Sequence, residues 1–412
     1  MFSLDSFYKI LSRHLLEPVH FESHYFTKFG STDVRDLDCV YDPDIPYWCG
    51  DVPKILMFYD QEPIYVKQFM QLYTTPDSVA NETWHSIYYR TYTNGYGRFL
   101  YFQSIFHIIA NSEHSNEKND LFATLGLSNW YYFFHGFAAL DWFRNIRYLP
   151  PRRSFTHLFI CFNNLHTKKR NYRLNLVARL FNEQIMHCGL VSLNPNNLAE
   201  NIREELFSNS NYLSKEAKKL IYQHLTHAPR LTIDTDSPHG ALSAFDDLDV
   251  LSQGLFHIVT ETIFYDEKLH LTEKVFKPIV ARRPFFLVAA PNNLAYLRSY
   301  GFRTFDRWID ESYDQEQDPD RRLDMIVKEL KRLSMLDHGE LDQMYNEMQE
   351  IIEYNFNWFW VGFRKTIVNE LVDNYRRCLI KFNAGKDSSF CNYVDYSQVD
   401  FENTKLVLSD SV

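Results

Sequence analysis

Residues 256–314 read FHIVTETIFYDEKLHLTEKVFKPIVARRPFFLVAAPNNLAYLRSYGFRTFDRWIDESYD, in which apolar runs alternate with polar loops. Two runs, FHIVT at 256–260 and PFFLVAA at 284–290, have the length and the aromatic and β-branched content of buried strands. Between them, TEKVFKPIVA at 272–281 has the pattern of a helix, and Thr272 is suited to cap its start. This order of strand, polar loop, helix and strand predicts a βαβ unit of a parallel sheet.

Four polar residues stand between the first strand and the helix: Glu261, Thr272, Glu273 and Lys274. Ligands of open parallel sheets bind beyond the carboxyl ends of the strands, where helix N-termini offer free N–H groups to anions. Lys274 adds a positive charge for a phosphate, and Glu261 is suited to accept hydrogen bonds from sugar or ribose hydroxyls. The loop therefore indicates a nucleotide or nucleotide-sugar site. The alternative is a capped helix start, with Glu273 and Lys274 as solvated first-turn charges.

The arrangement F-x-x-x-x-E, from Phe256 to Glu261, followed by LTEK at 271–274, resembles the donor-binding motif of α-1,3-fucosyltransferases. It is similar more broadly to two-domain (GT-B) glycosyltransferases, including phage-type enzymes. The resemblance implies an α/β fold with two Rossmann-like domains that face a central cleft, and C-terminal helices that cross back to the N-terminal domain. It also implies that Glu261, Thr272, Glu273 and Lys274 bind the donor.

Length and composition set the broad class of the protein. A chain of 412 residues is too long for one ordinary core, which predicts two domains. No apolar run has the length of a membrane span, and the first residues do not form a signal peptide, so we expect a cytoplasmic protein that does not contact a membrane. The six cysteines lack metal-ligand spacing, and no metal is predicted.

The net charge of −10 disfavours a broad nucleic-acid-binding face. Two local basic clusters leave a smaller basic groove open, one within 151–173 and the other formed by Arg282 and Arg283.

The domain boundaries follow from prolines and changes in pattern. The stretch YLPPRRS at 148–154 is the best linker, because paired prolines exclude a helix. We predict an N-terminal acceptor domain, a C-terminal donor domain, C-terminal helices that pack back across the cleft, and a polar tail. These parts span residues 1–150, 151–340, 341–384 and 385–412.

A second group of candidate donor-binding residues follows the first strand of the predicted donor domain. The strand FTHLFICF leads into HTKKRNYR, which contains Lys168, Lys169, Arg170 and Arg173. Four cations at a helix start oppose the helix dipole, which favours a binding role over a solvated helix end. Fucosyltransferases carry an Arg after the equivalent strand, and the resemblance matches it to Arg170. We predict that Arg170 and Lys169 bind the donor, although the spacing does not decide which of the four points inward.

An inverting sugar transfer needs a general base that takes the proton of the acceptor hydroxyl. The candidates are Asp60 and Glu62 in YDQEP and Glu113 in NSEHS, each of which follows a predicted strand of the N-terminal domain. The alternatives are a turn for DQEP and a helix N-cap for SEHS. Asp234-Thr235-Asp236 matches the D-x-D of metal-dependent single-domain glycosyltransferases, but this tripeptide is common and here comes late in the chain.

The predicted function is the transfer of a sugar from a nucleotide-sugar donor to a hydroxyl acceptor, with inversion and without a metal or another cofactor. One alternative is a phage-type DNA glycosyltransferase, for which the acceptor is a hydroxymethylated base. Another is a non-catalytic protein of the same fold that binds a nucleotide or sugar. The sequence does not name the sugar, the nucleotide base, the acceptor or the oligomeric state.

Overall fold

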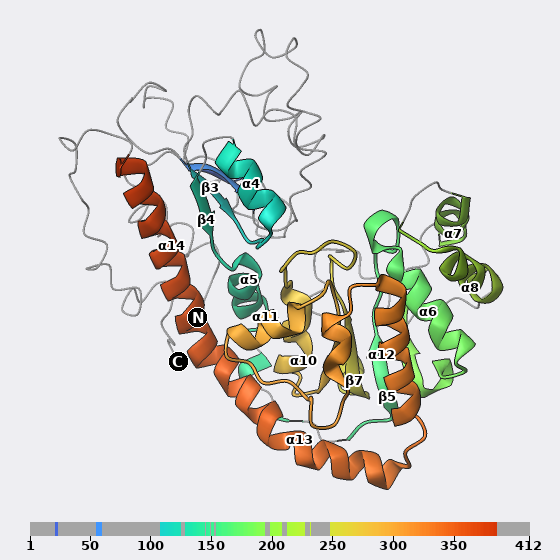
Figure 1. Cartoon of the computed structure of the whole chain (residues 1–412). Helices are drawn as coiled ribbons and strands as arrows, with labels where there is room; N and C mark the ends of the chain where they lie inside the picture. The colour runs from blue at the N-terminus through green and yellow to red at the C-terminus, as the bar shows by residue number, and fades with distance from the viewer. Residues whose placement is uncertain are drawn as a thin grey trace. The chain divides into compact units, whose positions relative to one another are not determined.

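The computed structural model (Figure 1) describes residues 21–23, 55–59, 108–124, 128–144, 146–148, 150–151, 154–193, 198–207, 212–226, 231 and 248–384. The chain divides into two compact units. Unit 1 takes Met1–Arg144 and Lys365–Val412, and unit 2 takes Asn145–Arg364. Each unit holds a parallel sheet with helices, which confirms the predicted α/β class. The two-domain GT-B architecture with a central cleft stays a prediction.

Unit 1 contains a four-stranded parallel sheet in which the strands lie in chain order. The strands are β1 (Phe21–Ser23), β2 (Ile55–Tyr59), β3 (Ile108–Asn111) and β4 (Ser128–Tyr131). The helices of this unit in the described residues are α4 (Asn116–Thr124), α5 (Phe134–Trp142) and, from Lys365 onward, α14 (Arg364–Ala384). Strand β4 anchors α14, because Trp130 Nε1 donates to Leu371 O at 3.1 Å and Asn374 Nδ2 donates to Tyr131 O at 3.0 Å.

Unit 2 contains a second parallel sheet, with the order β6-β5-β7-β8. Its strands are β5 (His157–Cys161), β6 (Gly189–Val191), β7 (Gly254–Thr260) and β8 (Phe285–Val288). From β5 the chain reaches β6 on one side and returns to β7 on the other. The space beyond the carboxyl ends of β5 and β7 is therefore a topological switch point, where open α/β sheets bind their ligands.

The described helices of unit 2 pack around this sheet (Figure 1). In chain order they are η4 (Ile146–Tyr148), η5 (Lys168–Arg170), α6 (Tyr172–Asn182), η6 (Met186–Cys188), α7 (Leu198–Phe207), α8 (Lys215–Leu225), α9 (Leu248–Leu251), η8 (Glu273–Val275), α10 (Phe276–Val280), α11 (Asn293–Ser299), η9 (Glu311–Gln315), α12 (Pro319–Leu333), α13 (His338–Trp358) and the π-helical η10 (Phe359–Phe363). None of the helices in the described ranges is both long and apolar enough to cross a membrane.

The predicted βαβ unit of residues 256–290 is confirmed. Strand β7 is buried along its whole length, as expected for a central parallel strand covered on both faces, and it pairs with β8 in parallel register. The predicted helix at 272–281 begins as the 3₁₀ turn η8 and continues as the five-residue α10. Thr272 caps this start, because its side chain accepts the Lys274 N–H.

Arg282 and Arg283 are used inside the fold, so this pair does not form the basic groove that the sequence left open. Arg282 lies 3.5 Å from the centroid of the Phe356 ring and forms an ion pair with Glu353 at 3.3 Å. Arg283 is 1% exposed. Both residues stabilise the turn that leads into β8.

A buried histidine in β7 gives unit 2 a pH dependence that can be tested. His257 is 5% exposed, and its Nε2 lies 2.8 Å from Leu251 O. Burial, with smaller contributions from the positive Arg283 and Lys277, lowers the pKa of His257 to about 4. An unfolded histidine has a pKa of about 6.5. At a pH between about 4 and 6.5, His257 therefore binds a proton in the unfolded chain but stays neutral in the folded chain. The free energy of unfolding should therefore fall as the pH drops from about 6.5 to about 4.

The measurement is urea unfolding of the wild-type chain and of His257→Gln at pH 7 and pH 5. The amide nitrogen of glutamine takes the place of His257 Nε2 as a donor to Leu251 O, but glutamine does not titrate. Between pH 7 and pH 5 the free energy of unfolding should fall by about 2 kcal/mol more in the wild type than in the variant. The reason is that a tenfold change in proton activity is worth about 1.4 kcal/mol for one proton. Equal losses in the two proteins would show that His257 does not carry this dependence.

Candidate functional site

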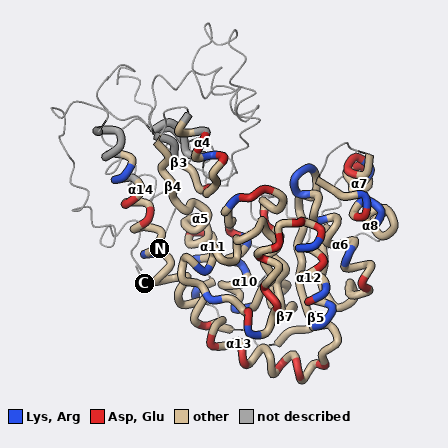
Figure 2. The backbone as a smooth tube through the Cα atoms, viewed as in Figure 1, with Lys and Arg blue, Asp and Glu red and all other residues tan. Residues whose placement is uncertain are grey.

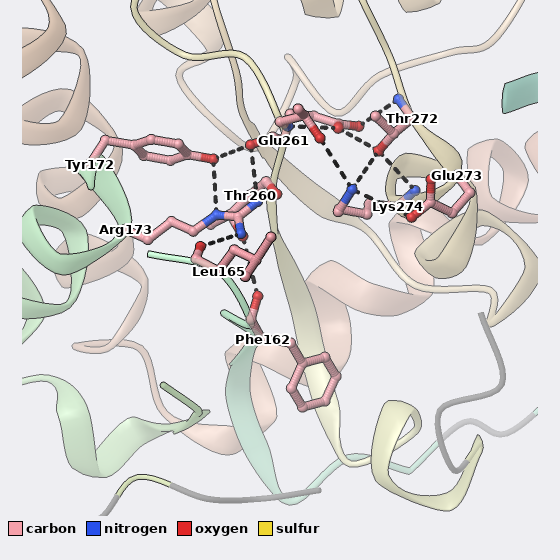
Figure 3. Close-up of polar contacts among 10 residues, drawn as sticks. Phe162, Leu165, Tyr172, Arg173, Thr260, Glu261, Thr272, Glu273 and Lys274 are labelled. Atoms are coloured by element: carbon pink, nitrogen blue, oxygen red, sulfur yellow. Dashed lines mark hydrogen bonds and ion pairs between the residues drawn. The ribbon is translucent and has the colours of Figure 1, made fainter. Parts of the chain in front are cut away.

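The carboxyl end of β7 carries Glu261, which is 0% exposed (Figure 3). Its Oε1 accepts the Thr272 N–H at 3.1 Å, and its Oε2 accepts the Thr262 N–H at 3.2 Å and the Thr272 hydroxyl at 2.5 Å. This carboxylate therefore joins the two ends of the loop between β7 and η8. The sequence predicted that Glu261 contacts a donor, whereas in this structure its carboxylate contacts the loop itself.

Lys274 extends this network to the surface (Figure 3). Its Nζ donates to Thr272 Oγ1 at 3.0 Å and to Thr262 Oγ1 at 3.5 Å. Its side chain is 31% exposed, and Nζ lies 3.4 Å from Glu273 Oε1. Two neutral hydroxyls and one carboxylate thus contact the ammonium group of this partly exposed lysine beyond the end of β7.

The alternative interpretation of this loop, a capped helix start with solvated charges, fits only in part. Thr272 is indeed the cap. Glu273, however, is 7% exposed and is not a solvated charge. The structure brings Glu261, Thr272, Glu273 and Lys274 together in one connected group, as the sequence predicted for the donor loop.

The loop after β5 carries the second predicted group, and Figure 2 shows its basic residues, in blue, where the chain leads into α6. Lys169 forms an ion pair with Asp266, in which Nζ lies 3.0 and 3.1 Å from the two carboxylate oxygens. Arg170 is half-buried. Because Asp266 belongs to the loop after β7, the Lys169–Asp266 pair connects the two loops that flank the switch point.

Helix α7 fixes the conformation of this basic turn. Lys168 has a left-handed backbone with φ of 55°, and its N–H donates to Glu205 Oε1 at 2.5 Å. The side chain of Asn171 donates to Glu205 Oε2 at 2.7 Å. A buried carboxylate from α7 thus holds the turn that presents Lys169 and Arg170.

Of the four cations in HTKKRNYR, Arg173 is the one that points inward. It is 3% exposed, and its guanidinium donates to Leu165 O at 2.6 Å, Thr260 O at 2.8 Å and Glu261 O at 3.1 Å. The sequence placed Arg173 among the four candidate donor-binding cations but favoured Arg170 and Lys169, and it did not decide which of the four points inward. The place of Arg173 in the first turn of α6, next to the fully buried Tyr172, was the signal that could have identified it.

The loop between β7 and η8 is also held from α11. Asn293 is 0% exposed, and its Oδ1 accepts the His270 N–H at 2.9 Å. Its Nδ2 donates to Lys268 O at 2.8 Å and to Ala290 O at 2.9 Å. Glu261 and Asn293 together give this loop a fixed shape, so that Lys274 projects from a rigid support.

Of the three predicted base candidates, only Glu113 lies in the described residues, since Asp60 and Glu62 fall outside them. Glu113 follows β3 and is 1% exposed. Its Oε1 accepts the Ser115 hydroxyl at 2.5 Å, and its backbone oxygen accepts a hydrogen bond from Lys118 Nζ. Glu113 therefore belongs to a buried polar cluster at the carboxyl end of β3.

Metal ligands do not gather in the part of the chain that the structure describes, where no group of three His, Cys, Asp or Glu residues could hold an ion. The D-x-D tripeptide at 234–236 lies outside the described residues.

Comparisons with known proteins leave the site to be judged on its own chemistry. No protein-family model matches this chain. No curated protein matches it either.

Proposed function

We propose that the chain is a glycosyltransferase of the two-domain GT-B class that moves a sugar from a nucleotide-sugar donor to a hydroxyl acceptor, with inversion and without a metal. The observation that supports this most is the position of the predicted donor residues. Lys274 follows β7 and the Lys169–Arg170 turn follows β5, so both lie beside the switch point of the unit 2 sheet. Ligands of open α/β sheets bind at such points.

The chemistry of the reaction explains why cations are needed there. The nucleoside diphosphate is the leaving group, so negative charge develops on its phosphate oxygens in the transition state. Without a metal, lysine and arginine side chains held in place before the reaction stabilise that charge. Lys274 meets this requirement, because the hydroxyls of Thr262 and Thr272 hold its ammonium group while its side chain stays 31% exposed.

The general base is proposed among Asp60, Glu62 and Glu113 of unit 1. Glu113 has the Ser115 hydroxyl at 2.5 Å as a partner for its carboxylate. A base must come within hydrogen-bond reach of the acceptor hydroxyl, and catalytic hydrogen bonds often form only in the complex with substrate. The donor nucleotide and the acceptor, a glycan or a modified DNA base, are the proposed partners. The internal use of Arg282 and Arg283 removes one of the two basic clusters that left a local DNA-binding groove open.

Binding of nucleoside diphosphates to the full chain tests this proposal. We expect UDP, GDP, ADP, CDP or dTDP to bind in calorimetric titrations, and Lys274→Ala to weaken that binding by roughly tenfold to a hundredfold. This range follows from about 1.5–3 kcal/mol for a hydrogen bond to a charged group. Lys328→Ala, which removes an exposed lysine from α12, is the matched control and should bind as the wild type does. Equal affinity in Lys274→Ala and the wild type would refute the assignment.

A further inference from the structure

Two buried arginines connect β5 and β7 at opposite ends of the unit 2 sheet. Arg173 binds Leu165 O, beyond the end of β5, and Thr260 O and Glu261 O, at the end of β7. Arg283 binds Ser154 O at 2.8 Å, ahead of β5, and Ser252 O at 2.7 Å, ahead of β7. The two side chains have the same kind of partner in the same unit, but only Arg173 lies at the switch point.

Arg173 is held entirely by neutral oxygens. Besides the three backbone carbonyls, its Nε donates to Tyr172 OH at 3.4 Å, and no ion pair with a described carboxylate accompanies it. A buried charge is usually paired, because removing it from water is costly. The hydrogen-bond partners of Arg173 thus carry no formal charge, and they lie at the edge of the sheet where an anion is proposed to bind.

Arg173 is also the start of the hydrogen-bond network that ends at Lys274 (Figure 3). Its Nη2 donates to Glu261 O, and Tyr172 OH donates to the same oxygen. The Glu261 carboxylate then accepts from Thr272, whose hydroxyl accepts from Lys274 Nζ at 3.0 Å. A change at Arg173 therefore reaches both the loop after β5 and the support of Lys274.

We propose that Arg173 is the positioning residue of the diphosphate site: it sets the distance between the loops after β5 and β7, and its charge adds to the positive potential felt by the ligand. This inference rests on the proposed function. Arg173 does not touch the ligand, but acts through Leu165, Thr260 and Glu261. Displacing binding groups by about 1 Å can cost up to about a hundredfold in activity, so we expect a loss of roughly tenfold to a hundredfold in affinity when Arg173 is removed.

The test compares Arg173→Met and Arg173→Lys with Arg283→Met and Arg283→Lys in the full chain. Each variant is measured for its melting temperature and for its affinity for the nucleoside diphosphate that the wild type binds. Both methionine variants should melt at lower temperature, because both leave buried carbonyls without donors. Only Arg173→Met should also lose affinity in the folded protein. Arg173→Lys should recover part of it, because lysine restores the charge but not the planar fork of donors.

Tyr172→Phe tests the same inference if the Arg173 variants do not fold. It removes one hydroxyl that donates to Glu261 O and accepts from Arg173, and it should weaken binding by about fivefold, since one such hydrogen bond is worth about 1 kcal/mol.

The inference is overturned if the folded Arg173 variants bind the nucleotide with wild-type affinity. It is also overturned if Arg283→Met loses as much affinity as Arg173→Met. Where the Arg173 variants do not fold, wild-type affinity in Tyr172→Phe overturns it. If Lys274→Ala loses binding while the Arg173 variants keep it, the proposed function stands and this inference fails. If the wild type binds none of these nucleotides, both fail.

Discussion

Replacing Glu261 with alanine should destabilise unit 2 by roughly 3–5 kcal/mol and weaken nucleotide binding by roughly tenfold to a hundredfold, as Lys274→Ala does. The reason is that the backbone N–H groups of Thr262 and Thr272 both donate to this carboxylate in the protein interior. An unsatisfied buried donor costs about 1–3 kcal/mol, and breaking a buried charged interaction costs about 3–5 kcal/mol. The Thr272 hydroxyl also loses its acceptor, so Lys274 loses its support. Urea unfolding and calorimetric titration measure the two effects.

Two further variants sharpen this prediction. Glu261→Gln has the same shape but turns one acceptor into a donor, so it should cost about 1–3 kcal/mol and weaken binding less than alanine does. Glu267→Ala removes an exposed carboxylate from the same loop and should change stability by less than about 0.5 kcal/mol. If Glu261→Ala is as stable as Glu267→Ala, the carboxylate of Glu261 does not hold the loop.

Asn293→Leu should have a destabilising effect of similar size, roughly 3–5 kcal/mol. Leucine is similar to asparagine in shape, but it leaves the backbone groups of Lys268, His270 and Ala290 without their partner. Each unsatisfied buried group costs about 1–3 kcal/mol. Because two of the three groups belong to the loop between β7 and η8, hydrogen exchange of that loop should also become faster.

The control for this prediction is Asn182→Leu, at an exposed position near the end of α6. It should change the free energy of unfolding by less than about 0.5 kcal/mol. Loop exchange rates in Asn293→Leu that match those of the control would contradict the role assigned to Asn293.

The local structure of unit 2 was predictable because it follows from short-range signals. The apolar run at 256–260, the cap at Thr272 and the second run at 284–290 each depend on neighbouring residues, and the structure confirms all three. The gathering of polar residues after β7 was predictable for the same reason, since side chains that follow a parallel strand lie at its carboxyl edge.

The partners of those residues were not predictable, because they come from distant parts of the chain. Nothing in the sequence pairs Lys169 with Asp266, or Lys168 with Glu205 on α7. The inward direction of Arg173 depends on how α6 packs against β7, which spacing alone does not give. For the same reason, the sequence suggested that Glu261 faces a ligand, whereas the folded chain turns its carboxylate toward Thr262 and Thr272. The role of Asp60 or Glu62 as the general base stays a prediction.

The location of a bound nucleoside diphosphate in a crystal of the full chain tests the central claim most directly. We expect the diphosphate to lie beyond the carboxyl ends of β5 and β7, with a phosphate oxygen about 2.7–2.9 Å from Lys274 Nζ, the usual length of a charge-assisted hydrogen bond. A nucleotide bound elsewhere on the chain, with Lys274 Nζ still contacted only by Thr262, Thr272 and Glu273, would contradict the claim.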